Sequence, residues 1–453
     1  MSGVSIAVGA PQQDQELALI MCHCGSESLP NPVADWTLEQ QVGALFMVGT
    51  PAGSSASAST VKLLKDRHVG GVFLHGRSNA GVTAIAKQTA AYQKAASTPG
   101  NLLIATDQEG GSVRVLQGAG FSTIPSAVKQ TSDKSLATDA KAWGTQLVKA
   151  GVNVNLAPVA DLVDKVAPAQ NKPIGYYARN YGKTVSSVEA GAGAFAQGMQ
   201  AAGVIPTLKH FPGLGRVTSN TDTTANVTDK YTKAGDDSIK IFTDLAQQLS
   251  ENRFKPWVMM SLASYPAIDS ENPAVFSSKT VGLLRKAGYE GVIITDDLSA
   301  ATQVQKYTPA ERAIKAISAG VDIVLYSATA KDVPVAMDAV IAKAKTDKAF
   351  AKCVLEAAGR VAKAQQSLVT KDNPAYSPEK YSPWDTKAWS KTTRKVTADV
   401  SLRATPEDGG VKITAIPKGT ALRLGELNST GKWYQTTFDG HQGWVPLAKL
   451  AAK

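Results

Sequence analysis

Cysteine is scarce in this sequence, with three residues among 453: Cys22, Cys24 and Cys353. An odd number leaves at least one thiol unpaired, so a scaffold built on disulfides is excluded. The tripeptide Cys22-His23-Cys24 is too short for a zinc site, and no matching ligands follow it. We therefore expect no metal site.

Positive charge is missing from the N-terminus, where no Lys or Arg precedes Lys62. The charged region that begins a signal peptide is therefore absent. The stretch LALIMCHCGSES nevertheless looks like the end of an apolar segment that runs into a Cys and a small polar spacer. Residues 1–31 are either the remnant of a lipoprotein signal or a disordered tail. No apolar run reaches the roughly 18 residues that a membrane span needs.

Blocks of Lys and Arg interleaved with aromatic residues are also missing, which disfavours nucleic-acid binding. The 48 basic and 38 acidic residues still give a net charge of +10. This excess indicates either an ordinary solvated basic surface or attraction to an anionic polymer such as a cell wall.

Apolar residues are plentiful, at 43% of the chain, and they predict a globular protein with a large core. Eight short apolar runs alternate with amphipathic stretches such as 82–97 and 310–320. The eight runs are 44–50, 70–77, 101–111, 152–162, 206–213, 257–266, 291–300 and 321–328. Continuous apolar runs are typical of buried parallel strands, so the pattern predicts an α/β fold with a (β/α)8 TIM-like barrel. An open doubly wound sheet is the alternative, but no G-x-G-x-x-G loop follows the first run.

Changes in composition divide the chain into four parts. The barrel is predicted over residues 32–370, after the tail. Residues 371–395 lose periodicity and gain Pro, Ser and Tyr, which indicates a linker. Residues 396–453 alternate short strand patterns with glycine-containing turns and predict a small all-β barrel.

Polar residues gather where the apolar runs end, and that end of a (β/α)8 barrel carries the active site. Asp296 follows GVIIT, Asp107 follows NLLIAT, and Lys209 and His210 end a third run. Two carboxylates in one concave site can cleave a glycosidic bond, while Lys and His can donate hydrogen bonds to sugar hydroxyls. Helix capping is the alternative role for any single Asp at a strand end.

Several long motifs in order resemble the glycoside hydrolase family 3 β-N-acetylglucosaminidases of the bacterial NagZ type. They are DQEGGSV, NLAPVADL, PIG followed by RNYG, KHFPG followed by an Asp, VMMSLASYPAID, PAVFS and GVIITDDLSA. The resemblance covers about residues 36–368. The C-terminal part, with LRATP and WYQTTFDGHQGWV, resembles a bacterial SH3 domain.

The resemblance implies a role for each matching residue. Asp296 matches the nucleophile that forms the glycosyl-enzyme, and Asp297 receives no catalytic role. Four residues match the groups that bind the non-reducing-end sugar: Asp107, Arg179, Lys209 and His210.

The sequence departs from the family at its acid/base motif, which usually reads D-S-H in the loop after KHFPG. Here the text is Asp222-Thr223-Thr224, and a threonine hydroxyl is too weak an acid to replace the histidine. Asp222 is the favoured acid/base. A group from elsewhere, such as His75 or Asp229, or slow turnover by a protein that chiefly binds, are the alternatives.

A second departure lies in DQEGGSVRV, where the family usually carries two arginines after the paired glycines. Ser112 and Val115 occupy those positions here, with Arg114 between them. A shift of one residue in extended backbone turns a side chain to the other face, so Arg114 is not expected to replace them.

The expected activity is release of terminal non-reducing N-acetylglucosamine from muropeptides, with retention and without cofactor or metal. The SH3-like part would dock to peptidoglycan, and the protein would be secreted or attached to the bacterial surface, with the cytoplasm as the alternative. A phosphorylase of the same fold and a weakly active peptidoglycan-binding protein are the other interpretations.

Overall fold

The structure is a computed structural model that describes residues 32–53, 55–368, 393–403, 412–427, 432–438 and 441–451. The predicted tail 1–31, with Cys22 and Cys24, lies outside these residues, as do residues 371–392 of the predicted linker. None of the described helices combines the length and the apolar character needed to cross a bilayer.

Eight parallel strands close into a barrel in the order β1-β12-β11-β8-β7-β6-β3-β2. Each strand lies within or overlaps one of the eight predicted apolar runs, so the predicted (β/α)8 barrel is confirmed. The strands are β1 Phe46–Pro51, β2 Gly71–His75, β3 Leu103–Thr106, β6 Val154–Asn155, β7 Ile205–Phe211, β8 Trp257–Met260, β11 Ile293–Asp297 and β12 Ile323–Tyr326.

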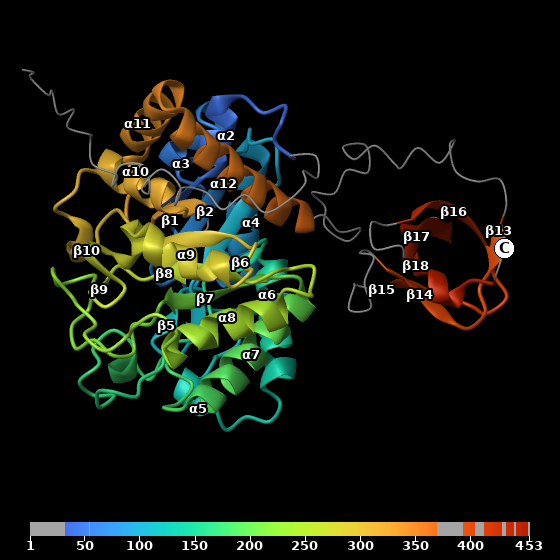
Figure 1. The fold of residues 1–453 in the computed structure, drawn as a ribbon, viewed down its shortest axis with the longest axis horizontal. Coiled ribbons are helices and arrows are strands. Elements are labelled where there is room, and N and C mark those ends of the chain that lie inside the picture. Colours follow the sequence, from blue (N-terminus) through green and yellow to red (C-terminus); the bar gives the residue numbers. More distant parts are fainter. Residues whose placement is uncertain are drawn as a thin grey trace, which may run out of the picture.

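Helices surround these strands (Figure 1). They are α2 Leu38–Ala44, α3 Ala58–Asp66, α4 Gly81–Ala95, α5 Ala127–Gln130, α6 Leu136–Lys149, α7 Val185–Ala202, α8 Asp237–Leu249, α9 Ser278–Lys286, α10 Pro309–Ala319, α11 Val333–Thr346 and α12 Lys348–Ser367. Short 3-10 turns lie at η1 Gly175–Tyr177, η2 Ala274–Phe276 and η3 Thr302–Val304. Buried residues of the strands and helices form one hydrophobic core between Val33 and Leu368.

Helix α10 shows how local sequence sets these elements. Thr308 caps its N-terminus by accepting from the backbone N–H of Glu311, and the Glu311 carboxylate accepts from the backbone N–H of Thr308. Such a capping box satisfies two backbone donors that a helix start leaves without partners. Ala313, Ala316 and Ile317 recur at helical spacing and are buried against the barrel.

In two of the predicted apolar runs, only the first part forms a strand of the barrel. The run 101–111 forms β3 and then turns into a two-stranded ribbon, β4 Gln108–Gly110 with β5 Val113–Arg114. The run 152–162 contributes the two residues of β6 and, beyond them, an isolated parallel bridge between Val159 and Lys209 of β7. A second short ribbon, β9 Ser264–Tyr265 with β10 Asp269–Pro273, follows β8.

The C-terminal part is an all-β sheet of six strands in the order β13-β16-β17-β18-β14-β15. The strands are β13 Thr393–Lys395, β14 Val400–Arg403, β15 Lys412–Ile416, β16 Ala421–Leu427, β17 Trp433–Phe438 and β18 His441–Pro446, with the 3-10 turn η6 Leu447–Lys449 after them. Its own core includes Leu402, Ile416, Leu422 and Val445. The last three residues of the predicted linker belong to this sheet, since 393–395 pair with β16.

Candidate active site

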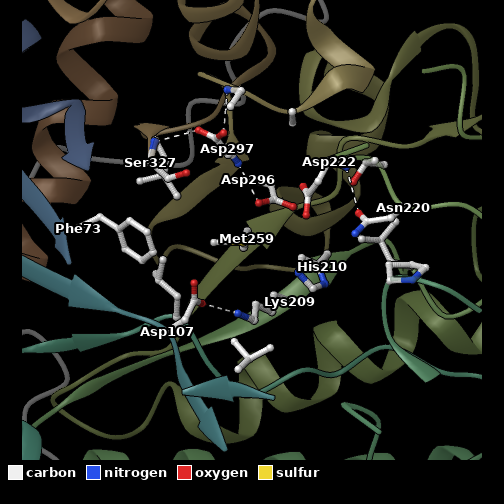
Figure 2. Close-up of a pocket in the computed structure, with 18 of the residues that line it drawn as sticks. Phe73, Asp107, Lys209, His210, Asn220, Asp222, Met259, Asp296, Asp297 and Ser327 are labelled. Atoms are coloured by element: carbon white, nitrogen blue, oxygen red, sulfur yellow. Dashed lines mark hydrogen bonds and ion pairs between the residues drawn. The ribbon is translucent and has the colours of Figure 1, made fainter. Parts of the chain in front are cut away.

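A pocket of about 350 Å³ opens at the carboxyl ends of the barrel strands (Figure 2). This volume is typical of a site for a small molecule. All six residues predicted for the site line it: Asp107, Arg179, Lys209, His210, Asp222 and Asp296. The strand ends and the loops that follow them therefore bring together side chains from five separate segments of the sequence.

One side of the pocket is backed by an alternating row of acids and bases, which we call the ionic chain: Asp107, Lys209, Glu109 and Arg179. Asp107, Lys209 and Arg179 line the pocket, whereas Glu109 is buried between Lys209 and Arg179 and is outside the lining. The Lys209 ammonium donates to Asp107 at 2.7 Å and to Glu109 at 2.6 Å. Arg179 donates two parallel hydrogen bonds to Glu109, at 2.9 and 2.7 Å. Such a bidentate pair fixes the orientation of a guanidinium as well as its position.

The charges of the ionic chain stabilise one another against burial. Burial acts to raise the pKa of Glu109, but Arg179 and Lys209 outweigh it and lower the pKa to about 2. Burial acts to lower the pKa of Lys209, and Asp107 and Glu109 reverse this effect and raise it. Both groups are thus charged near neutral pH, and Glu109 holds the ammonium of Lys209 and the guanidinium of Arg179 in place at the pocket wall.

His210 is oriented by a buried carboxylate. Its Nδ1 lies 2.8 Å from Asp161, whose other oxygen accepts from the backbone N–H groups of His210 and Leu214. The opposite edge of the imidazole ring is directed into the pocket (Figure 2). The peptide bond between Lys209 and His210 is cis.

Asp296 is at the end of β11 and extends its carboxylate into the pocket. It accepts a hydrogen bond from the backbone N–H of Asp297 at 2.8 Å, and within the described part of the chain it forms no ion pair. Burial raises the pKa of Asp296 to about 6, and the nearby Asp222 contributes to the increase, while His210 opposes it. A carboxylate with little stabilisation is a stronger nucleophile than one held by cations.

The carboxylate of the neighbouring Asp297 binds the segments that follow β11 and β12. Its carboxylate accepts from the hydroxyl and backbone N–H of Ser299 at 2.6 and 2.9 Å, and from the backbone N–H groups of Ala300 and Ser327, both at 2.8 Å. These four bonds occupy its oxygens (Figure 2 shows the bond to Ser327), and they agree with the absence of a predicted catalytic role.

The loop after β7 carries Asp222 to the rim of the pocket. Arg216 anchors its first half through paired bonds to Asp164 at 2.7 and 2.9 Å and a bond to Asp236 at 2.7 Å. The backbone oxygen of Asp222 accepts from the hydroxyl of Thr302 at 2.9 Å. The carboxylates of Asp222 and Asp296 face each other in Figure 2.

The residue that replaces the family histidine is directed elsewhere. Thr224 and its neighbour Thr223 are exposed and line an adjacent groove, not the pocket. The two substitute proton donors considered from sequence are also outside the pocket lining. His75 is half-buried at the end of β2, and Asp229 is buried and accepts three hydrogen bonds from Tyr231 and Thr232. Asp222 is therefore the candidate acid/base that the pocket lining includes.

Arg114 does not replace the two arginines that the family carries nearby. Its guanidinium donates to Gln117 at 2.9 Å and to the backbone oxygen of Ser122 at 3.4 Å, outside the pocket lining. Another arginine, Arg77, lines the pocket and donates to the backbone oxygen of Ser112 at 2.7 Å. A role for Arg77 was not predictable from sequence, because Arg77 follows β2 and its partner Ser112 is 35 residues away along the chain.

Glu109 and Asp161 likewise received no predicted role from the sequence. Both lie near the C-terminal ends of apolar runs, 101–111 and 152–162, and their charge at that position was the available signal. Their function is to hold Lys209, Arg179 and His210, and such partners are recognised only once the fold places them. No group of three or more His, Cys, Asp or Glu side chains in the described ranges is arranged to hold a metal ion.

Known proteins resemble this chain over the same region. Residues 37–364 match the family described as "Glycosyl hydrolase family 3 N terminal domain". "Beta-hexosaminidase LpqI" of Mycobacterium tuberculosis is 31% identical over 308 residues, which cover 66% of this chain and 75% of that protein. An "Uncharacterized secreted glycosyl hydrolase" of Arthroderma benhamiae is 31% identical over 298 residues, 64% of this chain and 82% of that protein.

A solved structure agrees with these sequence matches. The β-N-acetylhexosaminidase from Beutenbergia cavernae is 48% identical, with a TM-score of 0.70, and the match covers 74% of this chain and 99% of that one. The family match spans most of the chain and coincides with the barrel that carries the pocket. The chain belongs to glycosyl hydrolase family 3 and is a glycoside hydrolase.

Proposed function

We propose that the enzyme is an exo-acting, retaining β-N-acetylglucosaminidase that removes terminal non-reducing N-acetylglucosamine from peptidoglycan-derived fragments. The observation that carries the proposal is the carboxylate of Asp296, which faces the donors of Lys209 and His210 within one pocket. The names of the relatives, "Beta-hexosaminidase" and β-N-acetylhexosaminidase, support the sugar class.

Binding would place the non-reducing end of the sugar against the ionic chain. The side chains of Lys209 and Glu109 are almost fully buried, so the ionic chain would form the inner wall against which a chain end rests. Charged donors that are already in position lose little conformational entropy when they bind hydroxyls, and charge-assisted hydrogen bonds are strong.

In the first step, an Asp296 oxygen attacks the anomeric carbon and the bond to the leaving oxygen breaks. Asp222 gives its proton to that oxygen, which leaves as a free hydroxyl. In the second step, Asp222 takes a proton from water, the water oxygen attacks the anomeric carbon, and the bond to Asp296 breaks. Two displacements on one carbon restore the original β configuration.

The C-terminal sheet would act as an SH3-like module that retains the enzyme on peptidoglycan. Trp433 is buried and Tyr434 packs against the core of this sheet, in agreement with a structural role for these aromatic residues. The net charge of +10 would favour an anionic wall, and a secreted or surface-attached location would place the enzyme there.

The proposal is tested by comparing two substrates: an activated aryl β-N-acetylglucosaminide and N,N′-diacetylchitobiose. We expect Asp296→Asn to abolish cleavage of both. Asp222→Ala should spare only formation of the glycosyl-enzyme from the aryl substrate, because a phenolate needs little protonation to leave. Added azide should restore turnover of that variant and yield the β-glycosyl azide.

Asp237→Ala is the matched control, since Asp237 is an exposed acid on α8 away from the pocket. The proposal would fail if the wild type cleaved neither substrate, or if Asp296→Asn retained activity. Added phosphate provides a further distinction, because a phosphorylase would then release the sugar 1-phosphate.

A further inference from the structure

A second hollow, of about 390 Å³, lies directly beside the active-site pocket, and we call it the tyrosine groove. Eight residues line it: Lys172, Tyr176, Tyr177, Thr218, Ser219, Asn220, Thr223 and Thr224. Asn220 also lines the pocket, so the two hollows share a wall. None of the matched family motifs assigns a role to the groove.

Two exposed aromatic side chains dominate this groove. Tyr176 is 56% exposed and Tyr177 is 47% exposed. Among the described residues, Tyr231 is the one other tyrosine with comparable exposure. Their rings meet edge to face, with centroids 5.0 Å apart and planes at 84°. The Lys172 ammonium lies 4.3 Å from the centroid of the Tyr176 ring. Adjacent exposed rings at the rim of a binding site are typical of a surface that a ligand covers.

The tyrosines are held rigidly relative to the catalytic residues. The buried Asn171 side chain donates to the backbone oxygens of Leu214 and Val217 at 2.8 and 2.7 Å, and accepts from the backbone N–H of Gly175 at 2.7 Å. A side chain at Gly175 would begin 2.7 Å from backbone atoms of Pro168, so only glycine fits there. The turn that carries both tyrosines is thereby joined to the loop that carries Asp222.

The arrangement of acids sets the direction in which a leaving group departs. Asp296 and Lys209 line the pocket and are partly or fully buried, whereas Asp222 lines it and is exposed. The leaving oxygen must lie within hydrogen-bond reach of its proton donor. From Asp222 the lining continues through Asn220 into the tyrosine groove.

We propose that the tyrosine groove is the binding site for the sugar residue on the reducing side of the scissile bond, which stacks on Tyr176 or Tyr177. This inference rests on the proposed function. The apolar face of a pyranose ring suits an aromatic surface, while Ser219, Asn220 and Thr223 offer partners for its hydroxyls. The groove lining contains no carboxylate, and Lys172 forms no ion pair within the described residues, so the site would accept a sugar that carries an anionic substituent.

The test compares substrates with and without a sugar in the leaving group. The β-fluoride of N-acetylglucosamine has a leaving group too small to reach the groove, whereas N,N′-diacetylchitobiose and the disaccharide with N-acetylmuramic acid fill it. For Tyr176→Ala combined with Tyr177→Ala, we expect kcat/KM on both disaccharides to fall about tenfold, with the fluoride unchanged within twofold. The double Tyr→Phe variant should retain wild-type values, because it keeps both rings.

Tyr231→Ala is the matched control, since Tyr231 is 51% exposed and lines neither hollow. Equal loss on fluoride and disaccharides would overturn the inference, because it would mean that the tyrosines only support the turn that carries Arg179. Unchanged kinetics on all substrates would also overturn it and would leave the groove as a candidate surface for a protein partner. If the wild type cleaves the fluoride and the disaccharides but the tyrosine variants cleave them equally well, the inference alone is refuted. If the wild type cleaves no substrate, the proposed function is refuted as well.

Discussion

Asp296 must lose its proton to act as a nucleophile, and its buried surroundings raise the pH at which the proton is lost. Its pKa of about 6 predicts an acid limb in the pH profile of the reaction. We expect kcat/KM for an activated aryl substrate to fall about tenfold for each pH unit below 6. The measurement is a pH series of initial rates at low substrate concentration, and an acid limb centred below pH 5 would contradict the raised pKa.

The same raised pKa implies that the ionised Asp296 lowers the stability of the fold. A carboxyl group with a folded-state pKa near 6 and an ordinary value of 3.8 contributes stability below pH 3.8 that is lost as the pH rises through 6. Asp296→Asn removes this charge, so we expect the free energy of unfolding at pH 7 to rise by about 1–2 kcal/mol. The gain should shrink at pH 4.

Denaturant unfolding of both proteins at the two pH values checks this prediction. Asp297→Asn is the control, and it should destabilise the protein instead, because Asp297 accepts four hydrogen bonds. A loss of stability in Asp296→Asn at pH 7 would show that its charge is well solvated.

At the end of the barrel opposite the pocket, a buried aspartate connects two helices and two strands. Asp322 precedes β12 and accepts from Arg285 of α9 and Arg360 of α12, each at 2.7 Å, and from the backbone N–H of Ile293 in β11. Because Asp322→Ala would leave two guanidinium groups without this partner, we expect a loss of about 3–5 kcal/mol in stability.

Activity below the unfolding range should remain at the wild-type level in Asp322→Ala, since the residue is remote from the strand ends that carry the site. Asp338→Ala is the matched control: Asp338 pairs with Arg67 on the surface and should cost less than about 1 kcal/mol. Equal effects of the two substitutions in denaturant unfolding would contradict the structural role of Asp322.

The elements of the barrel could be predicted from sequence because buried parallel strands leave uninterrupted apolar runs. The ribbons β4–β5 and β9–β10 could not, since strands of two to five mostly polar residues carry no such pattern. Likewise, Asp107 and Asp296 were predictable from their positions after strands and from family motifs. Arg77 and the tyrosine groove were not, because their roles depend on which loops the closed barrel brings together.

For the whole molecule, two separate hydrophobic cores predict two independently stable parts. One core comprises residues between Val33 and Leu368, and the other residues between Val396 and Leu450. We expect a chain shortened to residues 1–370 to cleave N,N′-diacetylchitobiose within twofold of the full-length rate. Its retention on insoluble peptidoglycan should be lost if the C-terminal sheet binds the wall.

Pull-down with purified peptidoglycan, in low salt and in 0.5 M NaCl, provides the measurement. Salt should weaken the part of the binding that arises from net charge, since it shortens the range of electrostatic attraction to about 4–5 Å. Equal retention of the shortened and full-length chains would assign wall binding to the barrel.

The unequal pairing of acids in the pocket has a consequence for inhibitors. Asp107 and Glu109 are neutralised by Lys209 and Arg179, while Asp296 forms no ion pair with a Lys or Arg among the described residues. An iminosugar whose ammonium replaces the anomeric carbon would supply that missing cation, and its affinity should increase as the pH rises through 6. An isomer with the ammonium at the opposite end of the ring would meet Lys209 and Arg179, so the position of one nitrogen decides between a tight inhibitor and a weak one.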